Sequence, residues 1–309
     1  MKRVLVTGAS GLVGRATLPA LLAAGFEVHA VSSSGARDVE PPVAWHRADL
    51  LDQNAATSVV HEVAPTHLLH LAWHTSPSDI YVSAENLRWV TASLHLLREF
   101  ARVGGRRAAI AGTCAEYEWT AEQYSEGSSP LNPSTLYGAC KYSLWLIASR
   151  MRELDQVGIG WGRLFSVYGP GEHPDRLVPF VARALLANED AGCTSGAQIR
   201  DFLYSGDAAE AFVALLQSDV NGPVNIASGQ GISVRTLVSE VGVTLGRPDL
   251  IRFGEVDLRE GEPAALVADT RRLNDEVGWS PSVEIATGIE QTVAWWRERV
   301  QPLDRSKIG

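Results

Sequence analysis

The chain is poor in the features that mark membrane, secreted and metal-binding proteins. Its 309 residues include three cysteines, which lie far apart and show neither metal-ligand nor disulfide spacing. No apolar run approaches the roughly 18 residues of a membrane-spanning helix. The apolar stretch after Lys2 and Arg3 is too short for a signal peptide. We therefore expect a cytoplasmic protein with reduced thiols, no metal and no membrane partner.

The chain also lacks any run rich in lysine or arginine. Its net charge is −9 at pH 7 and its isoelectric point is about 5.4, which argues against nucleic acid as a partner. A small anionic ligand is still compatible with this charge, because a few well-placed arginines can hold one. Hydrophobic residues make up 45% of the chain, enough for one large core or two modest ones.

A glycine-rich turn lies close to the beginning of the chain. The strand-like stretch 3–7 leads directly into TGASGLVG, and an apolar helix follows. Glycine lets the backbone approach a pyrophosphate, and a helix start offers it free N–H groups. This setting predicts a dinucleotide site, although an ordinary strand-to-helix turn has the same pattern. The cofactor-binding residues predicted here are Gly8, Ser10, Gly11, Leu12, Val13 and Gly14.

Strand and helix patterns alternate through the first half of the chain. Strands are predicted near 3–7, 27–31, 43–46, 67–72, 107–112 and 159–165. Such alternation is typical of an α/β fold with a doubly wound parallel sheet, and it predicts a Rossmann dinucleotide-binding domain over 1–165. A Gly- and Pro-rich stretch and shorter elements follow, which predict a smaller mixed α/β C-terminal substrate lobe over 166–309.

Three residues in the first domain form a candidate catalytic group. Tyr137 and Lys141 stand four apart in a predicted helix and share one face of it. A neighbouring ammonium should lower the phenol pKa from about 10 towards neutrality. Thr113 follows a predicted strand, at the sheet edge where open α/β sheets place their chemistry. By itself a Tyr-x-x-x-Lys spacing is common, and a core phenol beside a surface amine would show it too.

TGASGLVG, Thr113 and YGACK together resemble the extended short-chain dehydrogenase/reductase family, in its nucleotide-sugar epimerase, dehydratase and 4-ketoreductase branch. The resemblance extends over nearly the whole chain. It implies that 201–220 folds back onto the first domain, and that helices near 79–103 and 134–156 pair in a homodimer. It also implies that Asn86 joins the proton relay. The further cofactor contacts that it implies are Asp49, Leu50, Leu71, Ala72 and Trp73, besides Tyr137 and Lys141.

The same resemblance implies a nucleoside-diphosphate sugar as substrate. Arg200 in RDFLYSGDAAEA and Arg259 in REGEP match arginines that hold a sugar-nucleotide pyrophosphate in the family. Surface salt bridges are the alternative for both arginines, a loop-capping role is the alternative for Glu116, and a role as a small filler residue is the alternative for Cys114. The predicted substrate contacts are His74, Thr113, Cys114, Glu116, Val178, Arg200 and Arg259.

The end of the second strand favours one nicotinamide cofactor over the other. An acidic side chain there binds the ribose hydroxyls of NAD and repels the 2′-phosphate of NADP. This chain has Ser32, Ser33 and Ser34 at that point and no carboxylate before Asp38, while Arg37 is close enough to pair with a phosphate. We therefore expect NADP, with NAD as the alternative and with Arg37 as a solvated loop charge in that case.

The residues after Thr113 narrow the reaction. The 4,6-dehydratases of the family carry an Asp-Glu pair directly after this position, whereas this chain has Cys114 and Ala115. Dehydration is therefore not expected, and the reactions left are those that need only hydride transfer and proton exchange. Among these we predict reduction of the 4-keto group of a nucleoside-diphosphate 4-keto-6-deoxyhexose. The alternatives are an NAD-dependent nucleotide-sugar 4-epimerase, another carbonyl reductase and a non-catalytic cofactor-binding sensor.

Overall fold

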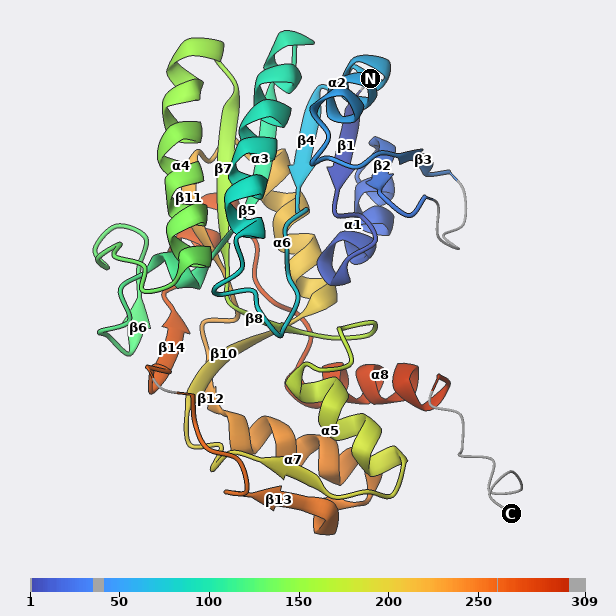
Figure 1. Cartoon of the computed structure of the whole chain (residues 1–309), viewed down its shortest axis with the longest axis vertical. Coiled ribbons are helices and arrows are strands. Elements are labelled where there is room, and N and C mark those ends of the chain that lie inside the picture. The colour runs from blue at the N-terminus through green and yellow to red at the C-terminus, as the bar shows by residue number, and fades with distance from the viewer. Residues whose placement is uncertain (1, 36–41, 260, 300–309) are drawn as a thin grey trace.

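The computed structural model describes residues 2–35, 42–259 and 261–299. A seven-stranded sheet dominates the structure, in the order β11-β7-β5-β4-β1-β2-β3 (Figure 1). All of its pairings are parallel, which confirms the predicted doubly wound sheet. Its strands are β1 (Arg3–Thr7), β2 (Glu27–Ser32), β3 (Ala44–Arg47), β4 (His67–His70), β5 (Arg107–Thr113), β7 (Gly158–Leu164) and β11 (Gly222–Ile226).

Helices cover both faces of this sheet. A parallel sheet buried on both sides needs apolar side chains at successive strand positions, and β1 shows this directly. Val4 and Val6 belong to one hydrophobic cluster, whereas Leu5 belongs to the cluster on the opposite face. The first cluster includes residues of α1 (Leu12–Ala23) and α6 (Ser205–Gln217), and the second those of α2 (Gln53–Val63), α3 (Glu85–Arg102) and α4 (Leu136–Asp155).

Glycines in β7 allow one of these helices to pack closely. A Cβ on Gly160 would lie 2.8 Å from the side chain of Leu215, and one on Gly162 would lie 2.5 Å from that of Phe212. Both of these side chains belong to α6. The β7 residues that alternate with these glycines, Trp161 and Arg163, have their side chains on the other face of the sheet, where both are fully buried.

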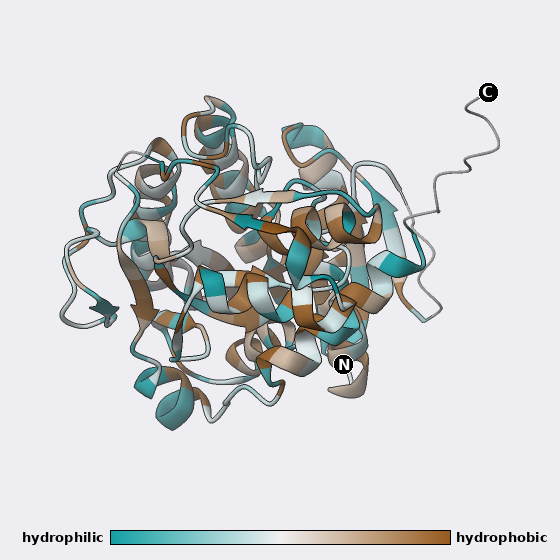
Figure 2. Ribbon diagram, turned by 90° about the horizontal axis from the view of Figure 1, so that it is seen from below, coloured by the Kyte–Doolittle hydropathy of each residue, from teal (hydrophilic) through white to brown (hydrophobic). Residues whose placement is uncertain are grey.

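The smaller lobe combines a mixed sheet with three helices and lies below the large sheet in Figure 1. In this sheet β10 is antiparallel to β12 but parallel to β8 and β14, and β14 pairs with β6. In Figure 2 the hydrophobic stretches lie mainly on strands and helices, and hydrophilic stretches alternate with them on the helices. The elements are β6 (Gln123–Tyr124), β8 (Ser166–Tyr168), α5 (Leu177–Leu186), β9 (Ala191–Cys193), β10 (Ile199–Tyr204), β12 (Gly231–Ser233), α7 (Val234–Leu245), β13 (Ile251–Phe253), β14 (Ala265–Ala268) and α8 (Ile285–Arg297).

Two strands cross the boundary that the sequence predicted at residue 165. β6 comes before this residue but pairs with β14 of the smaller sheet, whereas β11 comes after it and pairs with β7 of the large sheet. The returning segment is therefore longer than the predicted 201–220. Helix α3 also begins at Glu85 rather than near 79, because the residues before it form turns.

Among the residues that the structure describes, no helix combines the length and the apolar character needed to cross a membrane.

A buried carboxylate joins the strands and loops of the smaller lobe. Asp201 in β10 has no solvent exposure. Its Oδ1 accepts hydrogen bonds from the backbone N of Ser228 at 2.8 Å and from the Ser228 hydroxyl at 2.6 Å. Its Oδ2 accepts from the backbone N of Gly229 at 2.9 Å and of Ala268 at 3.1 Å. Both oxygens are therefore occupied by donors.

Replacing Asp201 with Asn should destabilise the protein strongly. The NH2 group of asparagine would replace one of the two accepting oxygens. It would face N–H donors that it cannot accept from, and these backbone groups would be left unpaired. We expect a loss of about 3 kcal/mol or more in the free energy of unfolding, measured by urea denaturation. Asp190→Asn is the control, because the Asp190 side chain is 53% exposed in its ion pair with Arg252 and should matter by less than about 1 kcal/mol. Equal losses in both variants would contradict this assignment.

Candidate active site

The glycine-rich turn packs against the residues that follow β4. Gly8 has a φ of +67°, and a Cβ there would lie 2.7 Å from the backbone N of Ala72. A Cβ on Gly14 would lie 2.1 Å from the carbonyl oxygen of Gly8. The predicted turn therefore requires glycine at both positions, because the neighbouring atoms are backbone and cannot move aside.

The beginning of α1 fits the pyrophosphate of a dinucleotide. Its N-cap residue is Gly11, which makes no side-chain capping bond, and the first turn contains no acidic residue. Its backbone N–H groups and the positive end of the helix dipole are thus available to an anion. The loop after β8 lies beside this helix, where Arg15 donates from Nη2 to the carbonyl oxygen of Gly171 at 3.2 Å.

The segment after β4 is anchored to β1. Thr7 accepts at its carbonyl oxygen from the N–H of Leu71 and at Oγ1 from that of Ala72. The ring of His70 lies between the hydroxyls of Thr7 and Ser93, at 2.7 and 2.8 Å. Burial, reinforced by the nearby Lys141 charge, lowers the pKa of His70 to about 3. His70 is therefore neutral and structural.

The end of β3, which lies beside the end of β2, contains a residue that the sequence analysis missed, Arg47. Ser32 is buried and accepts at Oγ from the backbone N of Ser34 at 3.3 Å, while Ser33 is exposed. Arg47 stands opposite Ser32 in the register of β2 and β3. Because Arg47 stands two residues before Asp49, a predicted cofactor contact, the sequence could have indicated Arg47 as a cofactor-binding residue too. The predicted Arg37 lies outside the described residues. Of the remaining predicted contacts, Asp49 is exposed and Leu50 is buried.

Thr113 and Tyr137 meet at the carboxyl end of β5. Tyr137 lies in the first turn of α4 and shares a side-chain hydrogen bond with Thr113. Burial raises the pKa of Tyr137 above its ordinary value, and the bond with Thr113 opposes this rise. The prediction of a pKa lowered by Lys141 is therefore wrong, because loss of solvent around the phenol has the larger effect. The phenol is a neutral, protonated group near pH 7.

Lys141 is held by the sheet and by an indole ring. Its Nζ donates to the carbonyl oxygen of Ala111 at 2.7 Å and lies 3.7 Å from the centroid of the Trp73 ring. Its exposed fraction is only 2%. Burial lowers the pKa of Lys141 to about 7, and the Glu116 carboxylate opposes this shift. The side chain of Lys141 can thus change between the charged ammonium and the neutral amine near neutral pH.

Asn86 is fully buried, and its side chain serves the structure. Its Oδ1 accepts from Nε1 of Trp73 at 2.8 Å. Its Nδ2 donates to the carbonyl oxygens of Ile80 at 2.8 Å and Ser83 at 2.9 Å. These bonds use all the polar groups of the side chain, which orients the Trp73 ring that lies against Lys141. The part of Asn86 in a proton relay stays a prediction.

One of the predicted arginines, Arg259, lies beside a tyrosine that sequence analysis also missed. The ring of Tyr81 lies 6.1 Å from that of Tyr137 and 5.0 Å from the Arg259 guanidinium carbon. Burial raises the pKa of Tyr81, and the charges of Arg176 and Arg259 oppose this rise. No sequence pattern marked Tyr81 or Arg176, which come from a turn and from the start of α5. Together they add an aromatic face and a third cation to this part of the site.

Arg200 enters the same region from β10. Burial raises the pKa of the Cys114 thiol to about 12, and the Arg200 charge opposes this rise. Arg200 also forms an ion pair of 2.7 Å with Glu262. The predicted His74 contact is hydrogen-bonded to Asp79 at 2.8 Å and remains partly exposed.

Two predicted substrate contacts are corrected by the structure. Glu116 has no solvent exposure, and its carboxylate is bonded to Trp161 and Arg163 inside the protein. Val178 is 2% exposed and belongs to the hydrophobic cluster of the smaller lobe. Neither side chain therefore faces a substrate, because each is committed to interior contacts.

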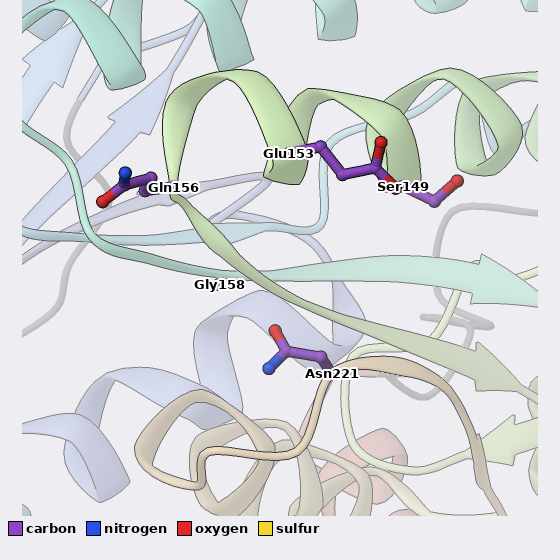
Figure 3. Close-up of a pocket in the computed structure, with 5 residues that line it drawn as sticks. All are labelled: Ser149, Glu153, Gln156, Gly158 and Asn221. Atoms are coloured by element: carbon purple, nitrogen blue, oxygen red, sulfur yellow. The ribbon is translucent and has the colours of Figure 1, made fainter.

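A separate polar hollow of about 650 Å³ lies away from these residues (Figure 3). Ser149, Glu153, Gln156, Gly158 and Asn221 line it. Gly158 begins β7, whereas the candidate site lies where β5 ends. This hollow is therefore at the opposite edge of the sheet. Within the described ranges, no group of three or more His, Cys, Asp or Glu side chains is placed to hold a metal ion.

Comparison with known proteins agrees with this geometry. The profile of the NAD dependent epimerase/dehydratase family matches residues 4–227. The chain belongs to this family. A nicotinamide dinucleotide is thus the cofactor class that the glycine turn and the uncapped start of α1 fit.

Individual relatives of this family cover nearly the whole chain. The UDP-glucose 4-epimerase of Mycolicibacterium smegmatis is 26% identical, over 97% of this chain and 100% of its own. The Thermus thermophilus UDP-glucose 4-epimerase, solved with NAD, has a TM-score of 0.85 and 27% identity over 96% and 99% of the two chains. TunA, an NAD-dependent NDP-hexosamine 5,6-dehydratase of tunicamycin biosynthesis, has a TM-score of 0.83 and 28% identity over 97% and 99%.

Cofactor affinity should fall as the pH rises through about 7. Lys141, with its pKa lowered to about 7, is charged below this pH and neutral above it. We expect only the ammonium to hold the cofactor well, so that affinity falls about tenfold per pH unit above pH 7. Titration of NADPH and NADH between about pH 6 and 9 measures this slope. Lys141→Met should remove it, and a flat response in the unmodified protein would contradict the prediction.

Proposed function

We propose that this enzyme reduces the 4-keto group of a nucleoside-diphosphate 4-keto-6-deoxyhexose. The observation that carries this proposal is the end of β2, where Ser32 stands opposite Arg47 and no carboxylate occupies 32–35. A hydroxyl and a guanidinium at this point can bind the 2′-phosphate of NADPH, and no carboxylate is there to repel it. A reductase exchanges its cofactor with solvent at each turnover and usually draws on NADPH, whereas an epimerase retains NAD.

The site residues have complementary roles in this reaction. A bound nicotinamide cofactor supplies the hydride. Tyr137 donates its phenolic proton to the carbonyl oxygen, and Thr113 hydrogen-bonds to the same oxygen. The raised pKa of Tyr137 keeps the phenol protonated before the reaction, as a general acid requires. Lys141 provides a positive charge within a nearly water-free site, where such a charge has a strong effect.

The residues after Thr113 argue against elimination of water. Burial raises the pKa of Cys114 to about 12, so that its thiol is a poor acid, and Ala115 has no ionisable group. Glu116 is the next carboxylate along the chain, and it is bound to Arg163 in the interior. An acid–base pair of the 4,6-dehydratase kind is therefore not formed by residues 114–116.

Arg200 and Arg259 suit the diphosphate of the substrate. They approach from β10 and from the loop before β14, on the side of Tyr81 and Cys114. Arginine forms paired hydrogen bonds with phosphate oxygens. Glu262, which pairs with Arg200 at 2.7 Å, would yield this cation to the ligand.

A second candidate is NAD-dependent 4-epimerisation of a nucleotide sugar. The similarity to two UDP-glucose 4-epimerases favours it, and Thr113, Tyr137 and Lys141 would serve this reaction as well. The two reactions differ in the fate of the cofactor, because a reductase consumes it and an epimerase regenerates it.

The cofactor preference can be tested directly. We predict that NADPH binds at least about tenfold more tightly than NADH, which corresponds to about 1.4 kcal/mol. Ser32→Asp should reverse this order by repelling the 2′-phosphate, and Arg47→Ala should weaken NADPH while leaving NADH nearly unchanged. Fluorescence titration measures each constant. Tighter binding of NADH by the unmodified protein would contradict the prediction and favour the epimerase.

The reaction can be tested with the purified protein, NADPH and enzymatically prepared 4-keto-6-deoxy nucleotide sugars. We expect cofactor oxidation in proportion to the keto sugar added. Tyr137→Phe should reduce kcat about 100-fold or more, the usual contribution of a placed acid, and leave cofactor binding in place. Conversion of a nucleotide hexose to its C4 epimer without net cofactor oxidation would replace the reductase with the epimerase.

We also propose a homodimer formed through α3 and α4. Leu87 on α3 is 55% exposed, and Leu146 and Ile147 on α4 are 47% and 46% exposed. Exposed large apolar side chains on two helices that pack together are typical of an interface. Light scattering after size-exclusion chromatography should give twice the 33.3 kDa of one chain, and Ile147→Glu should give the single-chain mass. A monomeric unmodified protein would overturn this assignment.

A further inference from the structure

An ion pair without solvent exposure lies directly beneath the candidate site. Arg163 Nε donates to Oε2 of Glu116 at 2.8 Å, and both side chains are 0% exposed. Trp161 adds a hydrogen bond from Nε1 to Oε1 of the same carboxylate at 2.9 Å. Trp161 and Arg163 belong to β7, whereas Glu116 ends the short 3₁₀ helix η1 (Cys114–Glu116) that follows β5. The carboxylate therefore joins two neighbouring strands.

This carboxylate also holds the backbone of a proposed catalytic residue. Oε1 of Glu116 accepts the N–H of Thr113 at 2.8 Å, and the Thr113 hydroxyl accepts the N–H of Ala115 at 3.2 Å. The two bonds form a reciprocal capping box across η1. The conformation of Thr113 is thus tied to the place of the buried carboxylate.

The residue before Thr113 has no room for a side chain. A Cβ on Gly112 would lie 2.2 Å from Nε1 of Trp161 and 2.6 Å from Oε1 of Glu116. The end of β5 is therefore in direct contact with the indole and the carboxylate. Displacement of either group would change the path of the strand that carries Thr113.

The other side of η1 lies against the helix that carries Tyr137. A Cβ on Gly138 would lie 2.1 Å from the carbonyl oxygen of Ala115. Gly138 follows Tyr137 directly, so the turn held by Glu116 contacts α4 beside the phenol. One carboxylate thereby fixes the separation between the strand of Thr113 and the helix of Tyr137.

Arg163 connects this arrangement to the edge of the sheet. Its Nη1 donates to the hydroxyl of Tyr117 at 3.2 Å, and that hydroxyl donates to Oδ1 of Asn225 in β11 at 2.8 Å. The positive charge also offsets the buried carboxylate, which would otherwise be costly to hold in the interior. Arg163 therefore supplies the counter-charge for Glu116 in the interior.

We infer that Glu116 is a positioning residue, whose ionised carboxylate sets Thr113 opposite Tyr137 and places a fixed negative charge beneath the site. This inference rests on the proposed roles of Thr113 and Tyr137. It assigns Glu116 a function that needs no contact with the substrate.

The fixed charge has a consequence that a packing residue would not have. Lys141 faces the Trp73 ring, the carbonyl of Ala111, neutral His70 and the charge of Glu116. The Glu116 carboxylate raises the pKa of Lys141 and of Tyr137. Removing its charge should move both pKa values down. The alkaline limb of the pH profile of kcat should then move to lower pH.

Glu116→Gln tests the inference, because it preserves the shape of the side chain and removes the charge. At about pH 6, where Lys141 remains charged in both proteins, we expect kcat to fall between about 10-fold and 100-fold, while KM and the cofactor Kd change less than about threefold. The alkaline limb should shift down by at least about half a pH unit. Glu99→Gln is the matched control, because Glu99 is another carboxylate with a side chain only 5% exposed, on α3. It should lower the Tm but leave kcat and the pH profile unchanged.

Two further variants keep the test decisive. If Glu116→Gln does not fold, the double variant Glu116→Gln with Arg163→Met removes both buried charges and should show the same loss of kcat. Thr113→Val separates this inference from the proposed function. Absence of keto-sugar reduction by the unmodified protein would overturn the proposed function. A normal kcat in Thr113→Val would overturn the role of Thr113 and with it the inference, whereas a low kcat there with normal values in Glu116→Gln would overturn the inference alone. A pH profile unchanged in Glu116→Gln would likewise contradict the inference. If the protein proves to be a nucleotide-sugar epimerase, the same variants are compared by their rates of epimerisation.

Discussion

Burial of both faces of the seven-stranded sheet limits where this protein can contact a small molecule. Helices cover the two faces, so the strands meet a ligand only where they end, and parallel strands bring their carboxyl ends to one edge. The glycine turn follows β1, the serines end β2, and Thr113 ends β5. The proposed cofactor and substrate contacts lie together for this one reason.

The same burial explains the unusual state of the charged groups near this edge. Lys141, Glu116 and Arg163 have exposed fractions of 2%, 0% and 0%. Charges so far from water persist only when they are paired or hydrogen-bonded. Lys141 is held by a strand carbonyl and an indole, whereas Glu116 and Arg163 hold each other. The electrostatics of the site are thus set by the protein interior rather than by solvent.

Many parts of the fold and of the site could be predicted from local patterns. Gly8 and Gly14 are required by the backbone of one turn, and a run of apolar residues predicts the strand that ends at Thr113. Other predictions were wrong because they depended on solvent. Tyr137 and Lys141 share a helix, yet burial raises the pKa of the phenol. Glu116 looked like a substrate contact beside Thr113, but its side chain turns into the core.

The sequence alone determined the sheet type, and it predicted the glycine turn and the candidate residues Thr113, Tyr137 and Lys141, because these depend on patterns within a few residues. Only the tertiary structure decided which distant groups meet. Glu116 pairs with Arg163 across 47 positions, and Arg47 stands opposite Ser32 through the register of two strands. Such pairings depend on strand order and helix packing, which the local patterns of a single chain do not specify.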